Sequence, residues 1–134
     1  MIEVEISRII IDEKKREQIL VLKEKDGIQL LPIVVGINEA AAIRLHLSGQ
    51  KPPRPMTHDL IKSILDNCSL SLQKVVIDQL KDNVFYAKLY LDGAEDSISV
   101  DARPSDSIAL AVRTGSPLFV EEEVFDALAR EEEL

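Results

Sequence analysis

The stretch Asp101–Pro117 constrains the fold more than any other part of the chain, because it has the pattern of a complete helix with both ends marked. Pro104 suits the start, since its fixed φ and missing N–H fit a first helical turn. Gly115 can adopt the left-handed closing conformation, and the proline two residues later prevents continuation. Residues 108–112 are all apolar, so other elements must enclose this helix on every side. We therefore predict a buried helix over residues 104–114.

Charged and hydroxyl side chains gather at the start of this helix. Asp101 and Arg103 precede it, and Ser105 and Asp106 lie in its first turn. The Ser105 hydroxyl can cap free backbone N–H groups. Asp106 in the first turn and Arg113 in the last complement the helix dipole. The pattern thus places a charged cluster at one end of a buried helix.

A second stretch, residues 54–61, repeats this pattern. Arg54 and a proline come first, Thr57 follows, and Asp59 precedes an apolar pair. Thr57 has the side chain of a helix cap, and Asp59 has the charge that a first turn favours. We predict a second helix that begins at Thr57 and ends near Asn67.

The rest of the chain alternates between strand-like and helix-like segments. Apolar side chains alternate with polar ones at Ile2, Val4 and Ile6, as in a half-buried strand. Asn38 is a good cap for the helix that follows it. The predicted strands are residues 2–12, 18–22, 29–35, 72–81, 84–91, 97–102 and 118–120, and two further helices are predicted at 39–48 and 123–133. Runs of strands interrupted by helices indicate an α+β domain and not a parallel doubly wound sheet.

The charge of the chain is acidic overall and uneven along its length. At 134 residues the chain has the length of one domain and can bury a sizeable core. Its net charge of −8 argues against indiscriminate binding of nucleic acid. Residues 121–134 contribute −6, however, whereas residues 40–63 contribute +3. A basic patch in the second region and a solvated mixed surface both remain open.

Several features bear on location and assembly. No run of apolar residues reaches the roughly 18 that a membrane helix needs, and the N-terminus lacks the apolar core of a signal peptide. The single cysteine, Cys68, cannot form an internal disulfide. We therefore expect a cytoplasmic protein that does not bind membranes. The predicted sheet has unpaired edge strands, so we also expect a homo-oligomer, most simply a homo-dimer.

Three blocks of the chain occur together in one known family. They are LPIVVGINEAAAI, RPMTHDL and DARPSDSIALAVRTGSPLFVEEEV, and they span about Pro32 to Val124. On these residues the chain resembles the bifunctional nuclease (BFN) domain family. The resemblance implies an α+β fold with a strongly bent, roll-like antiparallel or mixed sheet of about six to seven strands and about four helices. It also implies a single domain over residues 1–134 and hydrolysis of RNA and DNA phosphodiester bonds.

The motifs of the family match a set of polar positions in this chain. These positions are Arg54, Thr57, His58, Asp59, Asp101, Arg103, Ser105, Asp106 and Arg113. On this resemblance we predict that the catalytic residues are His58, Asp59, Asp101 and Asp106, and that the substrate-binding residues are Arg54, Arg103, Ser105 and Arg113. Many members also carry a C-terminal helical motif like that of nucleotide-excision repair proteins. We expect this chain to have an acidic C-terminal helix in place of that motif, without a partner docked through it.

Carboxylates at the ends of predicted elements are candidate metal ligands. Hydrolysis of phosphodiesters commonly uses Mg²⁺ or Mn²⁺, held by oxygen ligands, to polarise phosphate and activate water. We predict Asp59, Asp101 and Asp106 as ligands of such an ion. The alternative is structural, because Glu39, Asp59 and Asp106 also complement helix N-termini. We expect no organic cofactor, since the sequence lacks phosphate-binding and dinucleotide-binding glycine motifs.

His46 and His58 offer a second chemistry. Two histidines can act as base and acid in metal-independent cleavage of RNA. Their positions in two predicted helices do not show that they converge, and His58 can instead form a local hydrogen bond beside its cap.

We predict that the two Arg-Pro motifs lie side by side. Each places an arginine at the positive end of its own helix, where a carboxylate must compensate it. Pairing of Arg54 with Asp106, or of Arg103 with Asp59, would satisfy both helices and gather His58 at the same cleft. The alternative to a nuclease is a non-enzymatic oligomeric interaction or regulatory module, in which the matched polar residues maintain the fold.

Overall fold

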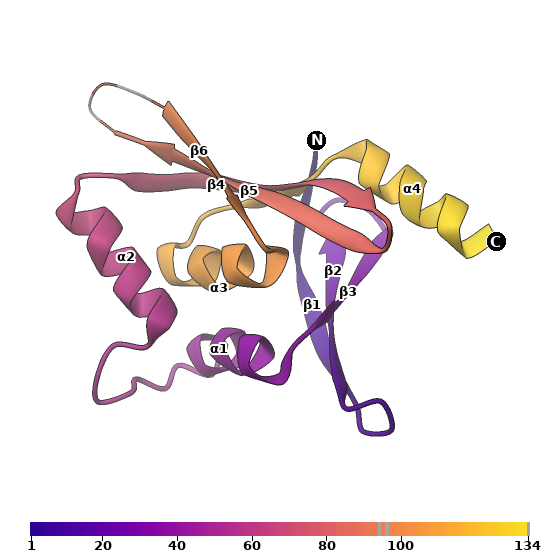
Figure 1. Cartoon of the computed structure of the whole chain (residues 1–134), viewed down its shortest axis with the longest axis horizontal. Helices are drawn as coiled ribbons and strands as arrows, with labels where there is room; N and C mark the ends of the chain where they lie inside the picture. The colour runs from indigo at the N-terminus through magenta and orange to yellow at the C-terminus, as the bar shows by residue number, and fades with distance from the viewer. Residues whose placement is uncertain (94, 96, 134) are drawn as a thin grey trace.

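The computed structural model describes residues 1–93, 95 and 97–133 as a seven-stranded sheet with four helices (Figure 1). The strands are β1 (Ile2–Asp12), β2 (Glu17–Glu24), β3 (Leu30–Val35), β4 (Ser71–Lys81), β5 (Val84–Asp92), β6 (Ser97–Ala102) and β7 (Leu118–Val120). The helices are α1 (Ile37–Leu47), α2 (Thr57–Asn67), α3 (Pro104–Thr114) and α4 (Glu122–Glu133). All the predicted elements are confirmed, with bounds that agree to within about two residues.

The sheet is mixed, and its strand order is β3-β2-β1-β7-β4-β5-β6. Every neighbouring pair is antiparallel except β4 and β7, which run parallel. In Figure 1 the strands β1–β3 lie at a steep angle to β4–β6, so the sheet bends strongly between these two halves. The sheet does not close, and β3 and β6 form its open edges. The predicted α+β fold with a strongly bent sheet is confirmed.

Helix α3 is the central element of the core. It packs against β4 and β5 on one side and against α1 and α2 on the other (Figure 1). Seven of its eleven residues are buried, including Ile108 and Leu110, whereas α1 buries two residues and α2 buries one. Gly115 ends the helix with a φ of 72°, the left-handed conformation that was predicted. The apolar run therefore identified the most enclosed of these three helices correctly, because a helix without a polar face must be covered all round.

Three predicted capping residues lie inside their helices, and these predictions were wrong. Helix α1 already starts before Asn38, α2 starts at Thr57 itself, and α3 starts before Ser105. A capping side chain has to come from the residue just before the helix. At α2 the Asp59 carboxylate supplies a different terminal bond, because it accepts the backbone N–H of the N-cap residue Met56 at 2.9 Å.

Helix α4 packs against β4, away from the other three helices (Figure 1). It buries Val124 and Phe125, while acidic residues occupy its first turn. Within the described ranges, no helix is long and apolar enough to cross a bilayer. The expected cytoplasmic location stays a prediction.

Candidate functional site

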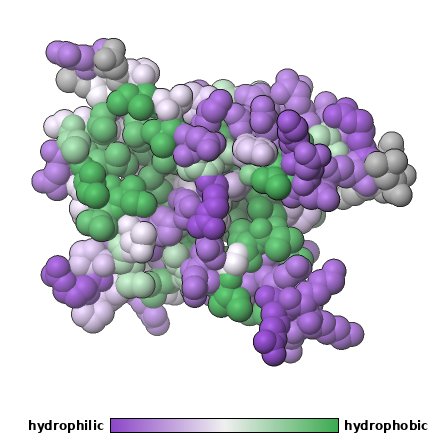
Figure 2. Space-filling view, in the orientation of Figure 1, coloured by the Kyte–Doolittle hydropathy of each residue, from purple (hydrophilic) through white to green (hydrophobic). Residues whose placement is uncertain are grey.

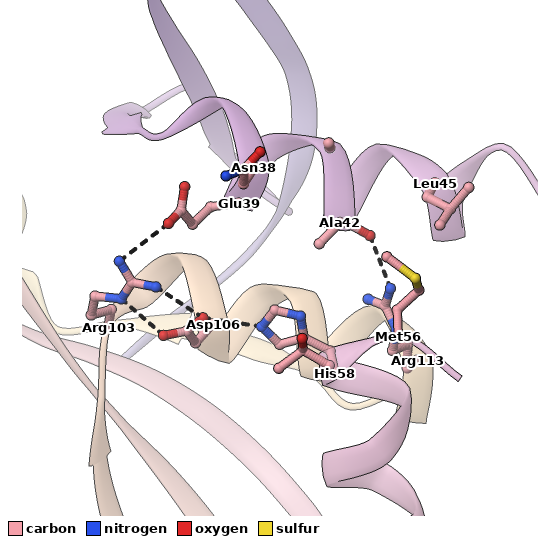
Figure 3. A pocket seen from close by; sticks show the side chains of 11 residues that line it. Asn38, Glu39, Ala42, Leu45, Met56, His58, Arg103, Asp106 and Arg113 are labelled. Atoms are coloured by element: carbon pink, nitrogen blue, oxygen red, sulfur yellow. Dashed lines mark hydrogen bonds and ion pairs between the residues drawn. The ribbon is translucent and has the colours of Figure 1, made fainter. Parts of the chain in front are cut away.

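A cavity of about 510 Å³ lies where α1 meets the starts of α2 and α3 (Figure 3). Its lining comprises Asn38, Glu39, Ala41, Ala42 and Leu45 of α1, Met56, Thr57 and His58 around the start of α2, and Arg103, Asp106 and Arg113 around α3. The α1 side is mostly apolar, whereas α2 and α3 contribute ionisable side chains. The cavity thus combines a non-polar wall with a charged one, as binding sites for small groups commonly do.

His58 and Asp106 form a hydrogen-bonded pair across two helices. His58 Nε2 lies 3.0 Å from Asp106 Oδ1, although 48 positions separate the two residues in the sequence. The contact forms because the first turn of α2 faces the first turn of α3 (Figure 3). His58 is 8% exposed, so the ring is held in the wall of the cavity. The prediction that the two Arg-Pro motifs lie side by side is confirmed.

Arg103 holds Asp106 with two hydrogen bonds and reaches a second carboxylate. Its Nε donates to Asp106 Oδ2 at 2.9 Å, and its Nη2 donates to Asp106 Oδ1 at 3.3 Å. Its Nη1 donates to Glu39 Oε1 of α1 at 3.4 Å. Burial raises the pKa of Asp106, but the hydrogen bonds from Arg103 and His58 outweigh burial and hold this pKa below its usual value. Asp106 is therefore ionised at neutral pH.

Arg113 ties three helices together at the other end of α3. Its Nε donates to Asp59 Oδ1 at 2.7 Å, Nη1 donates to the Ala109 carbonyl at 2.7 Å, and Nη2 donates to the Ala42 carbonyl at 3.0 Å. The Arg113 side chain is only 3% exposed. The backbone N–H of Met56, followed by Arg113, lowers the pKa of Asp59 in spite of burial. These bonds explain the position of Arg113 structurally, and its predicted role in substrate binding stays a prediction.

The second ring nitrogen of His58, Nδ1, is not used by the contact with Asp106. It makes no hydrogen bond to any described residue. In the part of the chain that the structure describes, no fully enclosed side-chain nitrogen or oxygen lacks a hydrogen-bond partner, so Nδ1 is not fully enclosed. A carboxylate bonded to one ring nitrogen fixes the ring and leaves the other nitrogen to act as a base. The His58–Asp106 pair therefore has the arrangement of a general base with its orienting carboxylate.

Four residues of the predicted site lie outside the lining of this cavity, and one of them is Asp59, which bonds Arg113. Asp101 of β6 lies opposite Lys88 of β5 in the strand register, one position away from the register partners Ala102 and Ala87. Because Ala87 is buried on the core face, strand alternation places Asp101 on the other face. Ser105 lies on the far side of the first turn of α3, where it lines a second hollow. Arg54 is exposed in the connector before α2. Sequence reasoning therefore identified part of the cavity and added residues from its surroundings.

The predicted ion pairs were wrong in their partners. Arg103 pairs with Asp106 of its own helix, and Asp59 pairs with Arg113. Among the described residues, no ion pair links Arg54 to Asp106. Arg103 and Asp106 are three positions apart on one helix and meet without crossing the interface, whereas the Arg113–Asp59 pair spans 54 positions and depends on helix packing.

The carboxylates of the predicted site do not form a ready metal site. Within residues 1–93, 95 and 97–133, no group of three His, Cys, Asp or Glu side chains is placed to hold one ion. Asp59 and Asp106 are each bonded to an arginine, and Asp101 lies on the other face of the sheet. The predicted ligands are thus not brought together, and binding of Mg²⁺ or Mn²⁺ stays a prediction.

The apolar wall of the cavity was not predicted. Asn38, Ala41, Ala42 and Leu45 lie on one face of α1, because helical neighbours are three and four positions apart. This spacing is visible in the sequence, but there it cannot be told from a stripe that faces the core. Met56 was missed because it precedes its helix and carries no charge.

The fold and the cavity define an α+β protein with a histidine–carboxylate pair in a cleft between helices. Comparison with known proteins is more specific. The family model of the bifunctional nuclease domain matches residues 20–133. An uncharacterized protein of Mycobacterium tuberculosis is 44% identical over 122 residues, which are 91% of this chain and 73% of that protein. The chain belongs to the bifunctional nuclease domain family.

Plant relatives carry the name of the family. Bifunctional nuclease 1 of Oryza sativa subsp. indica is 31% identical over 105 residues, which are 75% of this chain and 32% of that protein. Bifunctional nuclease 2 of Arabidopsis thaliana is 30% identical over 105 residues, with the same 75% and 32% coverage. The chain therefore spans about a third of the length of these plant proteins.

Proposed function

We propose that the chain is a nuclease that hydrolyses phosphodiester bonds of RNA or DNA, with the cavity between α1, α2 and α3 as its active site. The His58–Asp106 pair beside the exposed Arg103 carries this proposal, in a chain of the bifunctional nuclease domain family. The names of the plant relatives support the same activity.

In this mechanism His58 acts as the general base. Its Nδ1 accepts a proton from the attacking water, and the water oxygen forms a bond to phosphorus. The bond between phosphorus and the leaving sugar oxygen breaks, and the leaving oxygen takes a proton from solvent. Asp106 stays ionised and stabilises the imidazolium, which then returns its proton to solvent. The net reaction consumes one water and yields a phosphate monoester and an alcohol.

Arg103 supplies the positive charge that the phosphate requires. Its guanidinium is planar and can hold two phosphate oxygens at once. The side chain is 63% exposed, so a ligand can reach it without unfolding the site. Mg²⁺ or Mn²⁺, when bound, would polarise the phosphate further, and the protein steps given above do not depend on it.

The test is a cleavage assay with highly purified protein on labelled single-stranded RNA and DNA, in EDTA and in Mg²⁺ or Mn²⁺. We expect His58→Gln to lower kcat/KM by about 100-fold or more and Asp106→Asn by about tenfold or more. His46→Gln is the matched control, because His46 is an exposed histidine outside the cavity lining. Equal activity of the wild-type and His58→Gln proteins would contradict the proposal.

A non-enzymatic interaction module is the second candidate function, and an exposed apolar surface favours it. Leu60 and Ile64 of α2 are 54% and 52% exposed, and Ile98 and Val100 of β6 are 42% and 38% exposed. Figure 2 shows hydrophobic side chains gathered over this side of the molecule. β6 is also an open edge, so a second copy can extend the sheet and cover the surface.

We propose a homo-dimer through this surface. Light scattering at micromolar concentration should then report about twice the chain mass of 15.0 kDa. Val100→Lys should reduce the mass to that of one chain, because a buried charge without a partner opposes association. A wild-type protein that remains at 15.0 kDa would remove the dimer.

A further inference from the structure

A second hollow lies beside the proposed active site, on the other side of the first turn of α3. Its volume is about 330 Å³, and its lining includes Pro32, Val34, Val84, Phe85 and Ser105. Arg103 lines this hollow and the active-site cavity alike. Arg103 therefore lies between two neighbouring concave surfaces.

We propose that the two hollows and Arg103 bind two neighbouring nucleotides of a single strand of RNA or DNA. One base occupies each hollow, and the phosphate between them lies on the Arg103 guanidinium, beside His58. This inference rests on the proposed nuclease function and defines its substrate as an unpaired strand. In a duplex the bases are stacked inside the helix and cannot enter either hollow unless they are extruded.

Both hollows offer apolar surface to a base. Leu45 and Met56 line the first hollow, and Val34, Val84 and Phe85 line the second. Val34 is 60% exposed and Val84 is 51% exposed, so this surface is open to a ligand. Every base has a flat face that stacks on aromatic and apolar side chains without regard to sequence. Phe85 is half-buried against the core and is the aromatic residue among those that line the second hollow, so the exposed part of its ring is the candidate stacking surface.

The hydrogen bonds of Arg103 leave room for a phosphate. Its contact with Glu39 is long, at 3.4 Å, whereas its Nε bond to Asp106 is 2.9 Å. The Nη1 edge can therefore turn from Glu39 to a phosphate while the Asp106 bonds remain. The chain has a net charge of −8, which opposes a duplex more strongly than a single strand, because a duplex carries about twice as many phosphates per unit of length. The net charge of the chain therefore favours a single strand, as does the shape of the two hollows.

The test is fluorescence anisotropy with the full chain in EDTA, using a labelled single strand of about 12 nucleotides and the same strand annealed to its complement. Gel electrophoresis afterwards verifies that the probe is intact. We expect the single strand to bind at least about tenfold more tightly than the duplex, and Phe85→Leu to weaken binding of the single strand by about tenfold.

Tyr86→Leu is the matched control for Phe85→Leu. Tyr86 is the next residue of β5, is 39% exposed, and is not among the residues that line the hollow. Its replacement should leave binding unchanged, and melting curves of both variants control for stability.

The outcomes separate this inference from the proposed function. Equal affinity for single strand and duplex, or equal losses in the two leucine variants, would overturn the inference. Selective binding of the single strand without cleavage under any condition would support the binding site and contradict the nuclease proposal. Cleavage of duplex as fast as single strand would contradict the inference and leave the nuclease proposal standing.

Discussion

Each end of α3 carries an arginine–aspartate pair, and the two pairs have different surroundings. The Arg103 side chain at the start is 63% exposed, whereas the Arg113 side chain at the end is 3% exposed; their partners Asp106 and Asp59 are similar, at 35% and 31%. An exposed ion pair adds little to stability and exchanges partners readily, whereas a buried one is costly to break. The same chemical pair is therefore a structural tie at one end and a candidate ligand-binding group at the other.

The largest expected effect is on stability, at the buried end. Arg113→Met should lower the free energy of unfolding by about 3–5 kcal/mol, because it removes three hydrogen bonds from a side chain that is 3% exposed and leaves Asp59 Oδ1 without its charged donor. Urea unfolding followed by circular dichroism measures this loss. The double variant with Asp59→Asn should recover part of it, since the unpaired charge is then removed. A loss below about 1 kcal/mol would mean that the tie is not structural.

At the exposed end of α3 we expect a small effect on stability and a large effect on activity. Arg103→Gln should change the free energy of unfolding by less than about 1 kcal/mol, because water replaces its partners. The same variant should lower kcat/KM by about tenfold to 100-fold, since it loses a charged donor to the phosphate. Arg103→Lys keeps the charge without the planar fork and should fall in between. An Arg103→Gln protein that unfolds early but cleaves normally would reverse the comparison.

Acid should weaken the buried pair through its carboxylate. The backbone N–H of Met56 and then Arg113 hold the pKa of Asp59 below its ordinary value of 3.8. The unfolded chain then binds protons before the folded one does, so the free energy of unfolding decreases as the pH falls below that value. Asp59→Asn should flatten this decrease between about pH 5 and pH 2 in urea titrations. Parallel pH profiles of the two proteins would show that Asp59 does not contribute.

The smallest expected effect concerns Glu39, which competes with the proposed phosphate for Arg103. Glu39→Gln removes a carboxylate that shares Arg103 with the proposed phosphate, so affinity for the single strand should rise by about two- to fivefold at low salt. Anisotropy titrations at two salt concentrations measure this gain, which should shrink at high salt. Glu121→Gln, at a glutamate that pairs with the N-terminus instead, should leave the affinity unchanged. Equal affinities of the Glu39→Gln and wild-type proteins would remove the proposed competition.

The sequence by itself determined the elements and the family. Pro104, the apolar run at 108–112 and Gly115 act through neighbours along the chain, so their pattern was enough to define α3 and its ends. The same local logic gave the strands, because alternation reports which face of a strand is buried. The motifs around Arg54 and Arg103 also indicated that two helix starts belong to one region, which the His58–Asp106 contact confirms.

Only the tertiary structure decided which groups meet there. The contacts of Arg103 with Glu39, and of His58 with Asp106, depend on how α1 and α2 pack on α3. That packing is set jointly by side chains that lie far apart in the sequence. One step along a strand reverses the face of the sheet, and this step separates Asp101 from the carboxylates that it was predicted to join. Local pattern reports a residue's neighbours in the chain, whereas a site is made of neighbours in space.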